Sequence, residues 1–182
     1  MTLAVRWLAL LAVLGSACAR PGQPSGSAPA RAGSAEYQRL QELAFGLGAV
    51  TSLLVDCVES ADAAIRLAKG KPATTTALQD LRALLDDAGR TLAEHADDPP
   101  PPDEIERADG GVRGALDRAL EALEDAAANL EEARNQVLDL QEVAPPSLSD
   151  ALEDLRQRIE GCLTELTDLR DQVQPSPQAP GE

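Results

Sequence analysis

Apolar residues recur at alternating intervals of three and four along most of this chain, and that spacing restricts the fold more than any other feature. It places apolar side chains on one stripe of an α-helix, as in coiled coils. No stretch alternates apolar and polar residues as a half-buried strand does. The sequence therefore predicts an all-α fold, with helices at about 35–69, 75–97, 103–143 and 147–173.

The residues on these four stripes form the predicted core. In the third stripe large residues alternate with alanine, which lets a neighbouring helix approach closely. In chain order the stripes comprise Leu40, Leu43, Leu47, Val50, Leu54, Cys57, Ala61, Ala64 and Ala68; Leu78, Leu81, Leu85, Ala88 and Leu92; Ile105, Val112, Leu116, Ala119, Leu123, Ala126, Leu130, Ala133, Val137 and Leu140; and Leu148, Leu152, Leu155, Ile159, Cys162, Leu166, Leu169 and Val173.

Short segments rich in proline or glycine separate the predicted helices, at 70–73, 98–102 and 144–146. Short connections between long helices make successive helices antiparallel neighbours. We therefore expect an antiparallel up-down-up-down four-helix bundle with coiled-coil-like heptad seams.

The predicted helix ends rest on capping residues and glycines. Thr76 with Gln79 three residues later has the pattern of a capping box for the second helix. Gly110, Gly111 and Gly114 should weaken or break the first turns of the third helix, because glycine is a poor helix former.

Two cysteines lie on core stripes of the first and fourth predicted helices. Cys57 precedes Gly70 by 13 residues and Cys162 follows Ser147 by 15, which places them about 20 and 22 Å along their helices. Facing Cα atoms of packed helices lie roughly 5 to 6 Å apart, within disulfide range. We predict a Cys57–Cys162 disulfide; the alternative is two free core thiols.

Residues 1–17 have the features of an export signal. Arg6 carries the only early charge, and an apolar run from Trp7 to Leu14 leads into small residues and Cys18. The run is shorter than the roughly 20 apolar residues that a membrane-spanning helix needs. Export, with removal of this segment, is therefore expected.

The end of this segment, Gly15-Ser16-Ala17-Cys18, resembles the lipobox of a bacterial lipoprotein precursor. Ser16, Ala17 and Cys18 match that pattern, whereas Gly15 stands where leucine is usual. The resemblance implies cleavage before Cys18, a lipid on its side chain and a place in the bacterial cell envelope. Ala19 in the next position implies outer-membrane sorting where there are two membranes. Ordinary signal-peptidase cleavage after Ala17 or Ala19 is the alternative, and it would yield a secreted, non-lipidated protein.

Two further segments lack any apolar period. Residues 18–33 are small and broken by proline, which is typical of a disordered tether. A flexible linker of about 14 residues spans roughly 20 Å on average. Residues 174–182 form a Pro-rich tail, which leaves 34–173 as the folded bundle.

The composition excludes several classes of function. Lys and Arg total 16 against 31 Asp and Glu, a formal net charge of −15, whereas nucleic-acid binding needs a basic face. There are one histidine and 2% aromatic residues, which argues against metal centres and base-stacking surfaces. We find no motif for a nucleophile, a haem or a di-iron site, and we expect no enzymatic activity and no cofactor.

An acidic corner follows the second predicted helix, around four consecutive prolines. Carboxylates in this pattern are candidates for weak contact with a cation or a basic partner, although acidic residues also suit a helix N-terminus as solvated capping charges. The acidic corner consists of Asp97, Asp98, Asp103, Glu104 and Glu106.

These features predict a membrane-tethered, extracytoplasmic structural or protein-interaction module. Its expected partners are the lipid bilayer, through the lipid on Cys18, and an envelope protein that the sequence does not identify. A small-ligand or cation-binding helical sensor is the alternative. The heptad stripes leave the oligomeric state open, because they serve packing within and between chains equally well.

Overall fold

The structure, a computed structural model, describes residues 30–106 and 110–174, with side chains from residue 35 onward. Within these ranges it contains helices and no strand, so the all-α prediction is confirmed there. The helices are α1 (Ala30–Leu67), α2 (Pro72–Ala93), α3 (Pro102–Ile105), α4 (Gly111–Val143) and α5 (Pro146–Val173). The predicted signal peptide, Cys18 and the tail beyond 174 lie outside the described residues.

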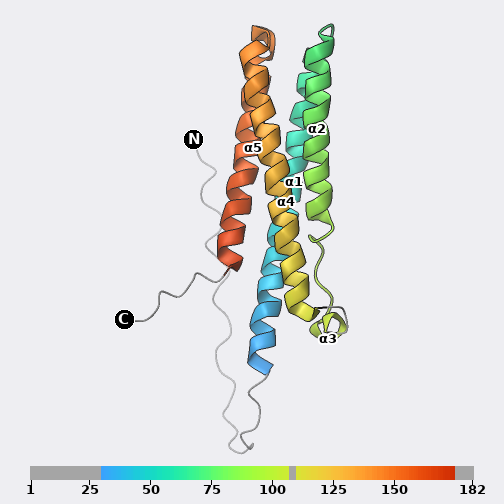
Figure 1. Ribbon diagram of the computed structural model, residues 1–182, viewed down its shortest axis with the longest axis vertical. Helices are drawn as coiled ribbons and strands as arrows, with labels where there is room; N and C mark the ends of the chain where they lie inside the picture. Colours follow the sequence, from blue (N-terminus) through green and yellow to red (C-terminus); the bar gives the residue numbers. More distant parts are fainter. Residues whose placement is uncertain (1–29, 107–109, 175–182) are drawn as a thin grey trace, which may run out of the picture.

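The four long helices lie side by side along one axis, and we call this array the rod (Figure 1). Helix α1 packs against α2 and α5, and α4 packs against the same two helices; α1 and α4 touch less. The turns from α1 to α2 and from α4 to α5 lie at the top of Figure 1. The start of α1 and the short α3 lie at the bottom, and α5 also runs downward but ends above them.

The core of the rod contains the predicted stripes. All of the predicted stripe residues are buried except Leu116, which is half-buried, and the cluster runs through all five helices. Ala44 and Ala122 are buried in addition. No polar or charged residue in the described ranges is buried. Burial of an aliphatic side chain contributes about 1.5–3 kcal/mol, so this continuous apolar core is the main source of stability.

Proline, and not a side-chain cap, begins three of the helices. Pro72, Pro102 and Pro146 each stand in the first helical turn. Proline suits this place because its fixed φ matches the helix. It has no N–H, but an N–H in the first turn would have no acceptor within the helix, so no hydrogen bond is lost. Helix α2 consequently starts ahead of Thr76, and no side-chain cap hydrogen bond closes its N-terminus. The predicted capping box at Thr76 and Gln79 is therefore wrong.

The predicted helix 103–143 is divided in the structure. Helix α3 is a single turn ending at Ile105, and α4 begins at Gly111. Gly110 and Gly111 have φ values of 85° and 58°, in the left-handed region that is incompatible with a continuing α-helix. Because Ile105 is nevertheless buried, the single turn still contributes to the core.

Other boundaries shift by a few residues. Helix α1 begins at Ala30, so residues 30–33, predicted as part of the tether, are helical; its last residue is Leu67. Helix α2 ends at Ala93, earlier than the predicted 97. The earlier start of α1 suits Ala30 and Ala32, because alanine favours helix.

One helix in the described residues is long and apolar enough to cross a membrane by length and composition alone. This stretch is Ala35–Leu67 within α1, with a mean hydropathy of 1.5 over its most apolar window, a third of which (33%) is buried in the rod. Core helices of soluble proteins and signal sequences pass the same test. The property is weakly compatible with export or anchoring.

Candidate functional site

The two core cysteines face each other in the middle of the rod. Cys57 of α1 and Cys162 of α5 are 0% and 1% exposed, and their Sγ atoms lie 3.7 Å apart as thiols. The hydrogen bond with Cys162 and burial both raise the pKa of Cys57, which disfavours a reactive thiolate. The predicted disulfide therefore stays a prediction, between two sulfurs that already lie next to each other.

Polar groups bridge α1 and α5 on the surface near this pair. The Ser60 hydroxyl donates to an Asp154 carboxylate oxygen at 3.2 Å, and Arg158 donates to the same oxygen at 2.8 Å. Arg158 also lies 4.0 Å from Asp56. The hydrogen bonds from Arg158 and Ser60 lower the pKa of Asp154, the arginine contributing more.

The structure divides the acidic corner into two groups. Asp97 and Asp98 in the loop after α2, and Glu104 in α3, line one pocket of about 330 Å³. Asp103 and Glu106 are exposed and do not line it. In the described residues no group of three or more His, Cys, Asp or Glu side chains is arranged to hold a metal ion.

The pocket at the acidic corner has an apolar floor and a fixed loop beside it. Leu40 and Ile105 contribute to the floor, and His95 lies on the rim. The Tyr37 hydroxyl donates to the backbone carbonyl of Pro99 at 3.1 Å, which ties the loop to α1. Glu94 and Arg118 also line the pocket, so it combines apolar surface with several carboxylates and one guanidinium group.

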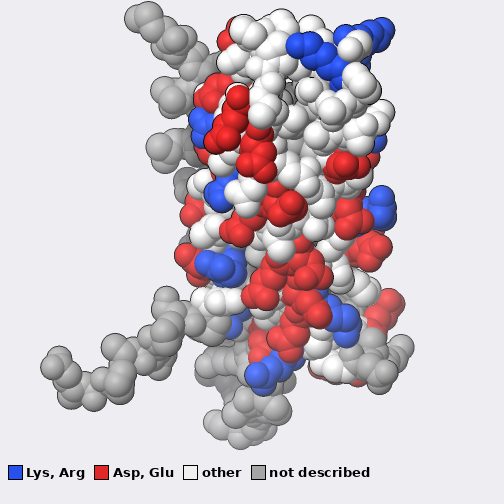
Figure 2. Space-filling view, turned by 45° about the horizontal axis from the view of Figure 1, so that its top comes forward, with Lys and Arg blue, Asp and Glu red and all other residues white. Residues whose placement is uncertain are grey.

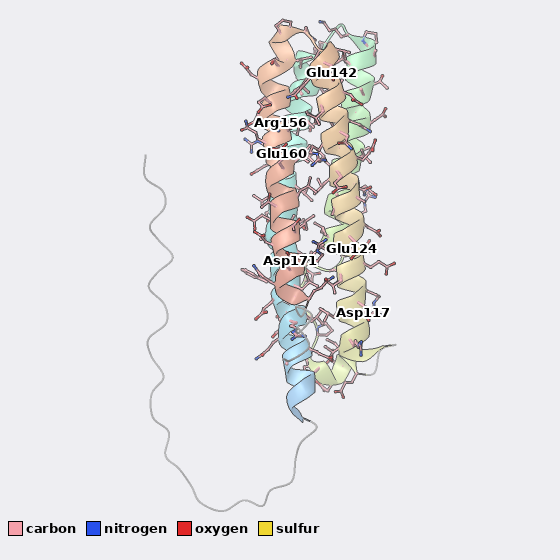
Figure 3. All side chains as sticks on the ribbon, turned by 60° about the vertical axis from the view of Figure 1, so that its left-hand side comes forward. Asp117, Glu124, Glu142, Arg156, Glu160 and Asp171 are labelled. Carbon is pink, nitrogen blue, oxygen red and sulfur yellow. The ribbon has the colours of Figure 1, made fainter. Side chains whose placement is uncertain are left out.

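Acidic residues outnumber basic ones in this chain, 31 to 16. Figure 2 shows broad red areas of Asp and Glu over the visible face, with the largest blue area of Lys and Arg at the upper right and smaller blue areas scattered lower down. Arg156 and Glu160 project from neighbouring turns of α5 (Figure 3) and form an ion pair. Arg156 also pairs with Glu153 at 2.6 Å. Glu153 accepts hydrogen bonds from Arg156, Gln157 and Gln141, and they lower its pKa to about 2.

An exposed apolar face on α1 was not identified from the heptad pattern. Phe45 is 83% exposed, and Leu53, two turns further along the same face, is 42% exposed. Val55 is 54% exposed but lies on another side of the helix, next to α2. A signal was present in the sequence: thirteen consecutive residues, 43–55, carry no charge, in a chain of which 26% is charged. In this stretch exposed apolar residues stand between the buried ones in the sequence. A count of the core stripe alone therefore does not reveal the exposed apolar face.

Comparisons with known proteins return no match of any of three kinds. No family model matches the chain, and no curated protein or solved structure matches it.

Proposed function

We propose that this chain is an exported, lipid-anchored protein of a bacterial cell envelope, and that it works as a structural or protein-interaction module. The lipobox-like Gly15-Ser16-Ala17-Cys18 after an apolar run supports the anchor. The acidic exterior favours solubility and discourages non-specific association. The interaction role rests on one observation above all, the exposed apolar residues Phe45 and Leu53 on one face of α1.

We propose further that the rod is an antiparallel up-down-up-down four-helix bundle with coiled-coil-like heptad seams. The chain turns back after each of α1 and α4, and every long helix packs against two neighbours. Core side chains in three-four spacing support seams of the knobs-into-holes kind. With the anchor at the N-terminal side, the bundle would present its faces to other envelope proteins.

The anchor is tested by intact mass and fractionation of the protein expressed in a bacterial host with its own N-terminal segment. We expect a mature chain beginning at Cys18 with added acyl mass, recovered in the membrane fraction. Cys18→Ser should abolish the added mass and release the protein. A chain beginning at Arg20 in the soluble fraction would instead establish a secreted protein, and retention of Met1 would refute export.

The pocket at the acidic corner favours one second candidate, a binding bundle for a small cationic or amphipathic ligand. Four carboxylates, those of Glu94, Asp97, Asp98 and Glu104, line it together with one arginine, Arg118, and several apolar side chains. A ligand that binds only the folded state raises the melting temperature. Thermal melts with and without Ca²⁺, compared between the wild type and an Asp97→Asn/Asp98→Asn variant, distinguish this candidate: a shift in the wild type alone supports it, and its absence refutes Ca²⁺ binding.

A further inference from the structure

The exposed face of α1 is built from residues in regular helical spacing. Phe45, Ala49 and Leu53 follow one another at intervals of four, so their side chains lie on one face of the helix. All three are exposed. The uncharged stretch around them ends at Glu42 and Asp56 and extends over about 20 Å of helix. This length matches a partner helix of three to four turns.

A shallow groove between α1 and α5 adjoins that face. Its volume is about 140 Å³, and Gly46, Leu53 and Leu169 contribute apolar surface to it. A Cβ atom at Gly46 would come too close to the Leu169 side chain, which would then have to shift, so α1 and α5 pack closely at this point. The groove therefore has a defined floor that depends on the sequence of both helices.

Carboxylates form the α5 rim of the groove. Glu165 and Asp168 line it, both exposed. Within the described part of the chain neither forms an ion pair, because the α5 arginines pair with other carboxylates: Arg156 with Glu153 and Glu160, Arg158 with Asp154 and Asp56, and Arg170 with Asp171. The exposed apolar face of α1 thus lies beside these unpaired carboxylates. A partner that complements this surface has to be both apolar and basic.

We propose that this surface, the α1/α5 face, binds an amphipathic basic helix of a protein partner. Apolar side chains of that helix would cover Phe45 and Leu53, while its flanking Lys or Arg side chains would pair with Glu165 and Asp168. This is the helix-in-groove mode of peptide recognition. The inference rests on the proposed interaction function and names the class of partner.

Charge distinguishes this occupant from the other two candidates. A second copy carries the same net charge of −15, so pairing two such faces would bring the Glu165 and Asp168 rims together. An anionic lipid surface is repelled for the same reason. An amphipathic basic helix has apolar side chains for the exposed face of α1 and positive charges for the acidic rim on α5.

The test uses the full chain purified from the bacterial host and a fluorescent helical peptide of about 14 residues. Its leucines repeat at i, i+3, i+4 and i+7, with lysines on both flanks. Binding is measured by fluorescence anisotropy and mapped by NMR. We expect the strongest shifts at Phe45, Leu53 and Glu165. Phe45→Ala should weaken binding about tenfold or more, as for a buried aromatic anchor, and Glu165→Lys/Asp168→Lys should weaken it to a similar degree.

Matched controls separate this face from general stickiness or charge. Val143→Ala removes an apolar side chain that is 76% exposed on another helix, and it should leave binding unchanged. A peptide with glutamates in place of the lysines should bind much more weakly. Circular dichroism melts check that each variant remains folded.

Four results would overturn the proposal: no binding of the basic peptide, equal binding of the glutamate peptide, binding indifferent to Phe45→Ala, or a dimer in sedimentation that Phe45→Ala dissociates. Binding of the face to phosphatidylcholine vesicles in preference to the peptide would assign it to a membrane instead. These results leave the mass and location of the mature chain untouched. A failed docking test is therefore distinguishable from a failed anchor.

Discussion

At the scale of single residues, position on the helix decides what a side chain does. Cys57 and Leu53 lie one turn apart on α1, yet one is 0% exposed and the other 42%. Glu153 and Glu165 are both on α5, but only Glu153 accepts hydrogen bonds from three neighbouring side chains. Composition alone cannot distinguish such pairs, because the difference lies in which neighbours they meet.

The cysteine pair gives a redox-dependent prediction. If the mature protein forms the Cys57–Cys162 bond, Cys57→Ser should lower the free energy of unfolding more without reductant than with it. The chain-entropy model sets the upper limit at about 4–5 kcal/mol for a loop of this length. Urea unfolding with and without reductant measures the difference, with Cys162→Ser as the matched variant. Equal losses under both conditions would show a packed thiol.

Glu153 gives a pH-dependent prediction. Its pKa is lowered from 4.5 to about 2 in the folded chain. A depressed carboxylate pKa means that its stabilising contribution is present above about pH 4.5 and is lost as the pH falls through 2. Glu153→Gln should therefore lower stability near pH 6 and lower it much less near pH 2, where about half of the Glu153 side chains are protonated. Chemical unfolding at both pH values is the measurement, and an equal loss at pH 6 and pH 2 would contradict the assignment.

At the scale of the helices, the stripes predicted the elements, but backbone geometry decided their ends. Three helices begin at proline, and the break before α4 depends on the left-handed Gly110 and Gly111. The sequence predicted that glycines here weaken or break the first turns of the helix, yet it did not show that Gly110 and Gly111 adopt left-handed geometry. Despite this break Ile105 of α3 is still buried in the common core, and that burial is a tertiary contact.

Two glycine-to-alanine substitutions compare a glycine in ordinary helical conformation with one in left-handed conformation. Gly161 lies inside α5 with open space around its Cα, so Gly161→Ala should stabilise the protein by about 0.5–1 kcal/mol. Gly111 has φ of 58°, so Gly111→Ala should destabilise it by about 1–3 kcal/mol despite equally open space. Melting temperatures of the two variants provide the measurement. Stabilisation by both would show that α4 can begin with ordinary helical geometry.

At the scale of the whole molecule, stability comes from one apolar core that runs the length of the rod. Leu155 is 0% exposed in that core, whereas Leu138 is 43% exposed on α4. Leu155→Asp should abolish cooperative unfolding, because it buries an unpaired charge. Leu138→Asp should be tolerated, since its carboxylate reaches water. Thermal melts followed by circular dichroism compare the two, and a retained cooperative transition in Leu155→Asp would refute its place in the core.

The sequence by itself determined the helical class and the identity of nearly all core residues. A spacing of three and four is sufficient for this, because every residue on such a stripe faces the same side of its helix. It also predicted that Cys57 and Cys162 lie at matching heights, because helical rise converts residue number into distance.

Only the tertiary structure decided which surfaces remain after the helices pack. It brought Asp97, Asp98 and Glu104 to one pocket and left Asp103 and Glu106 outside it. It also left Phe45 exposed beside the α5 groove, although its apolar character alone would favour burial. The physical reason is that a groove or a rim is formed by two elements, and its shape and charge depend on where the second one lies.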